Sequence, residues 1–248
     1  MKIALIGYGK MGKTIHELAN EKNEKLGKKH YDISLIVDVE NRNTITKEEL
    51  QQVDVAIEFT SPHTAVDNIH WCFDANVPVV VGSTGWTEQL SEIKKYANEN
   101  NKAFLFAPNF SIGVNIFFEV NRYLAQIMNN HEEYNILLEE IHHTEKKDAP
   151  SGTGLHAALD ILKRIERKKD WINNKTDDNE TLSIISKREE NVPGTHVITY
   201  ESDIDKIDLI HTAHNRKGFA GGALLAADFV VNKKGAFSME DVLGFNRL

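Results

Sequence analysis

Short apolar runs alternate with stretches of helical periodicity over the first 110 residues. Each run is bounded by polar or turn-forming residues, which predicts strands buried on both faces. The predicted strands are Ile3–Ile6, Ile33–Val37, Val53–Phe59, Val77–Val81 and Ala103–Phe106. The predicted helices include one with Met11, Ile15, Leu18 and Ala19 on a single face, and others around Thr64–Ala75 and Thr87–Asn98. This alternation predicts an α/β fold with a doubly wound parallel sheet and right-handed crossovers.

The pattern changes after Asn109, where strands begin to follow one another with few helices between them. We expect helices over Val114–Met128 and from Ser151 to about Lys168, an exposed loop over Lys168–Glu180, strands over Asn135–His142, Leu182–Lys187, His196–Glu201 and Ile207–Ala213, and a helical tail from Gly218. Strands in series predict a second, α+β domain with a mixed or antiparallel sheet. We therefore divide the chain into residues 1–110 with 218–248, and residues 111–217.

Composition and charge exclude several classes of protein. No uncharged apolar stretch approaches the ~18 residues of a membrane helix, and the N-terminal apolar run is too short for a signal peptide. We therefore expect a cytoplasmic protein with no membrane partner. The single cysteine, Cys72, cannot form an internal disulfide or a multi-cysteine zinc site. The formal net charge of -8 argues against a nucleic-acid partner, so an anionic ligand must be attracted by local cations or helix N-termini.

Gly7-Tyr8-Gly9-Lys10-Met11-Gly12 is a G-x-G-x-x-G sequence between the first predicted strand and the first predicted helix. Its glycines permit a tight turn and let the backbone approach a pyrophosphate at the helix N-terminus. Asp38 ends the second predicted strand, where an acidic residue binds the adenosine ribose. This order predicts a Rossmann-type dinucleotide site rather than a glycine turn without a ligand.

The residues around Asp38 bear on the choice of cofactor. Val39, not an arginine, follows Asp38, so a 2′-phosphate would meet a carboxylate with no adjacent cation. We therefore expect NADH to be preferred over NADPH, or at least accepted. Arg42 lies close enough in sequence to reach the same place, which leaves NADPH open.

Small and hydroxyl-bearing residues follow three further predicted strands. These segments are Glu58–Pro62, then Gly82, Ser83 and Thr84, then Ala107, Pro108, Asn109 and Phe110. The carboxyl ends of parallel strands share one edge of the sheet. We therefore expect these strand ends to allow close approach of the nicotinamide and its ribose, and we assign the residues of the last two segments to the cofactor. Helix capping is the alternative explanation for each segment taken alone.

The segment from Glu140 to Gly154 is the richest in candidate chemistry. His142 shares a strand face with Glu140, and His143 points to the other side. A histidine here can exchange protons near neutral pH, and Lys146 can supply a cation or a proton. Ser151-Gly152-Thr153 begins a predicted helix, whose free N–H groups suit a carboxylate. The alternatives are that the histidines lie on the surface, that the lysines are solvated and that Ser151 is a simple N-cap. We expect no metal. A zinc site from His142, His143 and His156 would need its ligands to converge, whereas adjacent histidines on a strand diverge.

With these motifs in view, the chain resembles the 4-hydroxy-tetrahydrodipicolinate (dihydrodipicolinate) reductase family. The resemblance covers essentially the whole chain and is carried by the glycine loop, by Gly82–Gly85, by Ala107–Ser111, by Glu140–Thr153 and by His214, Arg216, Phe219-Ala220 and Gly222-Ala223. It departs from the commonest family pattern at Pro108, at Glu145, in a shorter glycine loop and in a short Val39–Gln52 region.

The resemblance implies an NAD(P)H-dependent oxidoreductase of lysine and diaminopimelate biosynthesis. The reaction would reduce a cyclic hydroxy-imine dicarboxylate, with His142 as proton donor or acceptor and Lys146 as second proton donor. His143, Gly152 and Thr153 would bind the substrate. The N-terminal domain with the tail would bind the dinucleotide, and residues 111–217 would bind substrate and build a homotetramer.

Two other functions remain open at this stage. One is another dehydrogenase of the aspartate pathway, although Cys72 lies within a predicted helix, unlike the nucleophile of an acylating enzyme. The other is a non-catalytic dinucleotide-binding regulator, which would keep Asp38 and the glycine loop but would not need His142 and Lys146 together.

Overall fold

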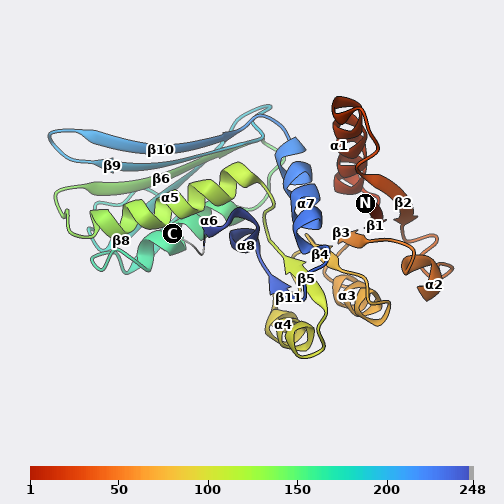
Figure 1. Ribbon diagram of the computed structural model, residues 1–248. Coiled ribbons are helices and arrows are strands. Elements are labelled where there is room, and N and C mark those ends of the chain that lie inside the picture. Colours follow the sequence, from red (N-terminus) through yellow and green to blue (C-terminus); the bar gives the residue numbers. More distant parts are fainter. Residues whose placement is uncertain (246–248) are drawn as a thin grey trace. The chain divides into compact units, whose positions relative to one another are not determined.

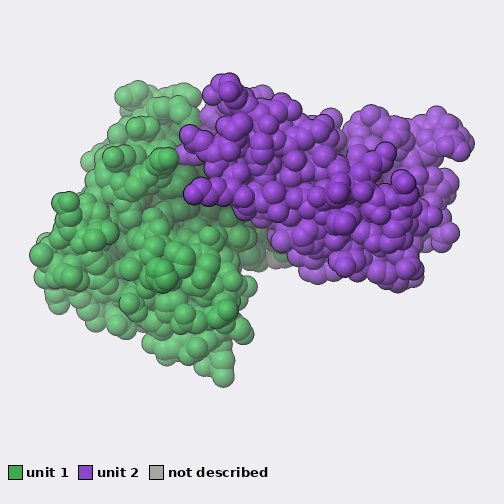
Figure 2. All heavy atoms as spheres, turned by 180° about the vertical axis from the view of Figure 1, so that it is seen from behind, with its two compact units in different colours: residues 1–112, 217–248 green, residues 113–216 purple. Residues whose placement is uncertain are grey.

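The computed structural model describes residues 1–245, and the chain forms two compact units (Figure 2). Unit 1 is Met1–Ile112 with Lys217–Leu248, and unit 2 is Gly113–Arg216. Each unit contains its own β-sheet (Figure 1).

Unit 1 is built on a six-stranded sheet in which every neighbouring pair is parallel. In spatial order the strands are β11 (Gly235–Phe237), β5 (Ala103–Phe106), β4 (Val79–Val81), β3 (Val55–Glu58), β1 (Lys2–Ile6) and β2 (Asp32–Val37). The helices are α1 (Lys10–Leu26), α2 (Lys47–Leu50), α3 (Ala65–Asp74), the 3-10 turn η1 (Thr87–Gln89), α4 (Leu90–Glu99), α7 (Lys217–Val230) and α8 (Met239–Leu243). The predicted doubly wound parallel sheet is confirmed.

Alternation along the strands of unit 1 fills two separate cores. Ile3 and Leu5 of β1 face α1 and α7, where Ile15 and Leu224 are buried with them. Ala4 and Ile6 face the opposite way, into a core that includes Ile69 and Phe73 of α3. Because both faces are covered by helices, the strands are apolar throughout, which is why the sequence shows continuous apolar runs.

Unit 2 is built on a five-stranded sheet of mixed direction, as predicted. Its order is β10 (Lys206–Ala213), β9 (Gly194–Glu201), β6 (Asn135–His142), β8 (Thr181–Arg188) and β7 (Asp170–Ile172). β9 runs antiparallel to β6 and β10, whereas β8 is parallel to β6 and β7.

Two helices cover one face of this sheet, α5 (Ile112–Met128) and α6 (Gly152–Leu162). Leu138 of β6, Ile184 of β8 and Ile198 of β9 are buried with them. Glu140 and His142 follow Leu138 on the same face, because side chains two apart in a strand point the same way.

Three sequence expectations were wrong in detail. The Lys168–Glu180 stretch is not only a loop, because it contains β7, which pairs with β8. The helix after Ser151 ends at Leu162 rather than near Lys168. The tail is not helical throughout, since β11 follows α7 and pairs with β5. Both missed strands are three residues long, too short for a periodic signal.

Among the described residues, none of the helices is both long enough and apolar enough to cross a lipid bilayer.

Candidate active site

The glycine loop joins β1 to α1 at the carboxyl edge of the parallel sheet. Gly7 has a φ of +95°, and a Cβ there would lie 2.2 Å from the carbonyl oxygen of Phe59. A Cβ on Gly12 would lie 2.3 Å from the Gly7 oxygen, so both positions require glycine for backbone packing. Gly9 differs, because nothing lies within 4 Å of the place where its Cβ would be. Gly9 is the N-cap of α1 and has no side chain to cap the helix. The first N–H groups of α1 therefore adjoin an open space.

A pocket of about 620 Å³ opens beside this loop. Of the predicted cofactor residues, Gly7, Tyr8, Gly9 and Asp38 line it, together with residues 39, 40, 42 and 43 after β2 and 59–61 after β3. Lys10, Met11 and Gly12 continue into α1 and do not line it. The pocket therefore joins the loop to the carboxyl ends of β2 and β3.

Asp38 follows β2 and uses one carboxylate oxygen within its own turn. Its Oδ1 accepts the backbone N–H groups of Glu40, at 2.9 Å, and Asn41, at 3.2 Å. Within residues 1–245, no protein donor is hydrogen-bonded to Oδ2. The turn thus anchors one carboxylate oxygen of a residue that lines the pocket.

Arg42 lies in the wall of the same pocket. Its guanidinium stacks on the Trp71 ring, 3.6 Å from the centroid, and its Nε donates to Asn68 Oδ1 at 3.0 Å. Partial burial lowers its pKa from the usual value, but an arginine stays charged at any physiological pH. A carboxylate and a guanidinium therefore line one pocket, which is relevant to the choice between NADH and NADPH.

The other predicted strand-end segments lie at the same edge but do not line this pocket. Gly82, Ser83 and Thr84 follow β4, and Ala107, Pro108, Asn109 and Phe110 follow β5. A Cβ on Gly82 would lie 2.1 Å from the Phe59 ring, and Phe59 in turn packs on Phe110. Ser83 Oγ accepts the Thr60 N–H at 2.7 Å, which ties the ends of β3 and β4 together.

Glu58 is the fully buried carboxyl group at the end of β3. Burial raises the pKa of this carboxyl group, and hydrogen bonds from Thr60, Ser83 and Asn68 lower it by a smaller amount. Its Oε1 accepts the Thr60 N–H at 3.0 Å. The sequence pointed to this strand end but not to the burial of its carboxyl group. The Glu58 carboxyl holds Thr60 by hydrogen bonding, and Thr60 lines the pocket.

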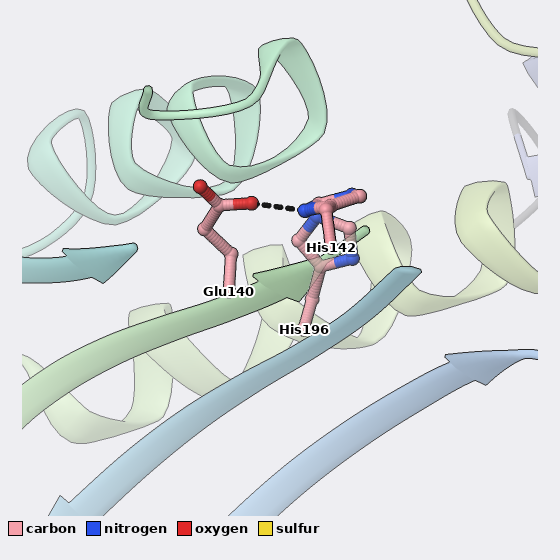
Figure 3. A group of neighbouring side chains, drawn as sticks. All are labelled: Glu140, His142 and His196. Carbon is pink, nitrogen blue, oxygen red and sulfur yellow. Dashed lines mark ion pairs between the residues drawn. The ribbon is translucent and has the colours of Figure 1, made fainter. Parts of the chain in front are cut away.

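In unit 2, His142 lies at the end of β6 with a side chain that is 10% exposed, against the fully buried Glu140 (Figure 3). The Glu140 carboxylate oxygen Oε2 contacts His142 Nδ1. The His196 ring of β9 packs edge-on against His142, with centroids 5.1 Å apart. The face shared by Glu140 and His142 is as predicted.

His143, the first residue after β6, lines a separate, open pocket of about 400 Å³ in unit 2. Arg216 and Asn191 line the same pocket. The structure thus places the two adjacent histidines in different surroundings, as expected for neighbours on a strand.

Lys146 lies in the loop between β6 and α6. Its Nζ donates to both carboxylate oxygens of Asp148, at 2.8 and 2.9 Å, and this hydrogen bond lowers the pKa of Asp148. Arg188 of β8 holds the loop from outside: Nη2 donates to the Asp148 carbonyl at 2.6 Å and Nε to the Lys146 carbonyl at 3.3 Å. Its Nη1 donates to Glu140 Oε1 at 3.0 Å.

Ser151 is the N-cap of α6, as its position predicted. Its Oγ accepts the Gly154 N–H at 3.0 Å, and its own N–H donates to Glu140 Oε1 at 3.3 Å. Gly152 and Thr153 form the first turn of α6, where N–H groups lack helical acceptors. Nothing lies within 4 Å of a Cβ built on Gly152, so this helix end is open to an anion.

Among the described residues, one group of three side chains lies close enough together to hold a metal ion: Glu140, His142 and His196. It is not the set that the sequence raised. His156 lies on α6, where it stacks on Phe118 with centroids 4.2 Å apart and pairs with Asp160. Glu140 already accepts hydrogen bonds from Arg188 and the Ser151 N–H and contacts His142.

Sequence reasoning missed Arg188, His196 and Asp148. Arg188 and Glu140 are 48 residues apart, and Ser151 and His196 are 45 apart. Only the pairing of β6 with β8 and β9 brings them together. Asp148 was within reach of sequence reasoning, because it lies two residues after Lys146.

Comparison with known proteins gives consistent matches over the whole chain. Residues 1–110 match the family model described as dihydrodipicolinate reductase, N-terminus, and residues 113–243 match the model for the C-terminus. The chain is 45% identical over 243 residues to the 4-hydroxy-tetrahydrodipicolinate reductase of Christiangramia forsetii, covering 98% of both chains. It is 37% identical over 227 residues to that of Methanocaldococcus jannaschii, covering 82% of this chain and 78% of the relative.

Among solved structures, the chain is similar in fold to the dipicolinate-bound dihydrodipicolinate reductase from Paenisporosarcina sp. TG-14. The TM-score is 0.79 at 22% identity, over 97% of this chain and 98% of that one.

Proposed function

Because the chain belongs to the dihydrodipicolinate reductase family, we propose that it reduces 4-hydroxy-tetrahydrodipicolinate to tetrahydrodipicolinate, for lysine and diaminopimelate biosynthesis, with the side chains identified above. It is an oxidoreductase with a dinucleotide-binding fold. The observation that carries the residue assignment is the group in unit 2, where a histidine held by a buried carboxylate adjoins an open helix N-terminus. That group suits proton transfer to a carboxylate-bearing substrate.

The nicotinamide cofactor supplies the hydride when bound, and unit 1 offers the residues to hold it. Gly7–Gly12 would hold the pyrophosphate at the N-terminus of α1, where Gly9 leaves room. Asp38 Oδ2 would accept from the ribose hydroxyls. Gly82–Thr84 and Ala107–Phe110, at the same sheet edge, would contact the nicotinamide end.

Unit 2 offers the residues for the substrate. His142 and Lys146 would supply protons. The N–H groups of Gly152 and Thr153 would hold one carboxylate, and His143, in the pocket with Arg216, would contact the substrate as well. A dicarboxylate approaching a protein of net charge -8 needs such local cations and helix ends. We also propose a cytoplasmic location, where the nicotinamide pool serves biosynthesis.

The test is NADH oxidation with substrate prepared immediately beforehand, repeated with NADPH. Oxidation that requires the substrate supports the reductase. A protein that binds NADH but oxidises none with this substrate would instead be a regulator, or a dehydrogenase of another aspartate-pathway intermediate.

For the cofactor, we propose that NADH is preferred and that Asp38 is the cause. Asp38→Asn should weaken NADH binding roughly tenfold, the scale of one hydrogen bond to a charged group. The amide oxygen can still accept the Glu40 and Asn41 N–H groups, so the turn is kept. The NH2 group then takes the place of Oδ2 and removes the negative charge, so NADPH should bind as well as before or better. Fluorescence titration with both cofactors measures this, and an equal loss for both would remove Asp38 from ribose recognition.

Arg42→Ala is the reciprocal variant. Because the guanidinium is the cation in that pocket, its loss should weaken NADPH more than NADH. Opposite changes in the NADH to NADPH preference of the two variants would indicate an effect of charge. Equal losses for both cofactors would indicate general damage to the pocket.

We further propose that the chain forms a homotetramer through the open face of the mixed sheet. Val197 pairs with Ile210 of β10 and with Glu139 of β6, which in turn pairs with Ile185 of β8. These side chains alternate with those that face α5 and α6 and so lie on the opposite face. Ile210 is 58% exposed there, and an apolar sheet face of this kind suits association with further copies.

Ile210→Lys should therefore lower the mass in solution below that of four chains, because it places a charge in the proposed contact. Light scattering coupled to gel filtration measures the mass. Ile204→Lys is the matched control, since Ile204 lies in the β9–β10 turn and is 91% exposed. An Ile210→Lys protein with an unchanged mass would place the contact elsewhere.

A further inference from the structure

Glu140 is a fully buried carboxylate in contact with three donor groups. Oε1 accepts from Arg188 Nη1 at 3.0 Å and from the Ser151 N–H at 3.3 Å, while Oε2 contacts His142 Nδ1 (Figure 3). Burial by itself raises the pKa of this carboxyl, but hydrogen bonds from His142, Ser186 and Arg188 outweigh it and bring the pKa to about 2. Glu140 is therefore ionised at any pH at which the protein works.

An ionised carboxylate has no proton to donate, so the proton in the contact between Oε2 and Nδ1 belongs to His142. In the neutral imidazole one nitrogen carries a proton and the other accepts. With Nδ1 protonated, Nε2 is left as the nitrogen that gives or takes a proton.

The His196 ring, which packs on His142, is held in its neutral form. Ser151 Oγ, which accepts the Gly154 N–H, is hydrogen-bonded to His196 Nε2 at 3.1 Å. Burial, with the neighbouring His142, lowers the pKa of His196 to about 3. His196 is thus a neutral neighbour, so it brings no second positive charge to an imidazolium at His142.

The Nε2 edge of His142 faces Gly194 of β9. A Cβ on Gly194 would lie 3.0 Å from Nε2 and 3.1 Å from Cδ2. A side chain here would press on the edge of the ring that carries the proton-exchanging nitrogen. Glycine therefore leaves that edge clear.

From these contacts we propose that Glu140 is a positioning residue that holds His142 in the form protonated at Nδ1, so that Nε2 alone exchanges a proton with the substrate. The inference rests on the proposed role of His142. When Nε2 gives its proton, the N–H bond breaks, the ring returns to the neutral form protonated at Nδ1, and Glu140 keeps its charge throughout.

Glu140→Gln tests this because the surroundings dictate which way the amide lies. Arg188 and Ser151 both donate to the Oε1 position, so the glutamine oxygen must lie there. The NH2 group then takes the Oε2 position and donates to His142 Nδ1. The variant keeps the shape of the side chain but imposes the opposite tautomer, with the proton on Nε2.

We expect Glu140→Gln to lower kcat by roughly 10²- to 10⁴-fold, the range seen for lost or misdirected acid–base catalysis. KM for the substrate and Kd for NADH should change little. Glu132→Gln, an exposed glutamate before β6, is the matched control and should turn over normally. A Glu140→Gln enzyme with near-normal kcat would overturn the proposal.

The tautomer can also be observed without turnover, which separates this inference from the proposed function. In protein with ¹⁵N-labelled histidine, with His142 assigned by difference from His142→Ala, the neutral ring should show a protonated Nδ1 and a bare Nε2. Glu140→Gln should reverse the two signals. A wild-type ring protonated at Nε2 would refute the role of Glu140, whatever the kinetics. The expected tautomers, together with normal turnover in His142→Ala, would instead refute the catalytic role of His142.

Discussion

Replacing His142 with alanine should lower kcat by roughly 10²-fold or more while NADH binding stays unchanged. The reason is that we propose the ring as the proton-exchanging group of unit 2, whereas the residues that we assign to the cofactor lie in unit 1. Lys146→Ala should cause a loss of similar size, because we propose its ammonium, held by Asp148, as the second proton source. Steady-state rates of NADH oxidation and a fluorescence titration of NADH measure the two effects separately.

Two controls match these variants. His131 is an exposed histidine after α5, and Lys147 is the neighbour of Lys146 outside its contact with Asp148. His131→Ala should leave kcat unchanged, and Lys147→Ala should have a much smaller effect than Lys146→Ala. Near-normal turnover in both His142→Ala and Lys146→Ala would remove the two residues from the mechanism.

The fold of unit 1 was readable from the sequence because its strands are buried on both faces. Runs such as Ile3–Ile6 and Ala103–Phe106 stand out as continuous apolar segments. β11 could not be found in this way. Its three residues, Gly235–Phe237, form a strand because β5 offers an edge to pair with, and this contact spans more than half the chain. Pairing over such distances leaves no mark in local periodicity.

The site in unit 2 shows the same division between local and distant information. The shared face of Glu140 and His142 follows from strand alternation, and the cap at Ser151 follows from its place before a helix. What a single segment cannot show is which side chains complete the group. Arg188 and His196 arrive on β8 and β9, and the proton that we assign to His142 Nδ1 depends on its contact with Glu140 in the folded chain.

Gly7→Ala should lower the free energy of unfolding by about 3 kcal/mol or more, from overpacking together with a left-handed backbone conformation. The φ of +95° disfavours alanine, and the new Cβ would meet the Phe59 backbone oxygen at 2.2 Å. Because the obstacle is backbone rather than a flexible side chain, it cannot move aside without shifting the end of β3. For a chain of this length, the melting temperature should fall by about 6 to 12 °C, as measured by circular dichroism without cofactor.

Gly9→Ala, two residues on, should have the opposite pattern. No atom lies within 4 Å of its Cβ, so the melting temperature should stay near that of the wild type. The methyl group would instead occupy the space through which the backbone approaches the pyrophosphate, and Kd for NADH should rise roughly tenfold or more, the scale of a lost hydrogen bond to a charged group. Unchanged NADH affinity in this folded variant would mean that the pyrophosphate does not lie at the N-terminus of α1. The two variants thus test separable roles that we propose for one motif, with Gly7 required by backbone packing and Gly9 by the ligand.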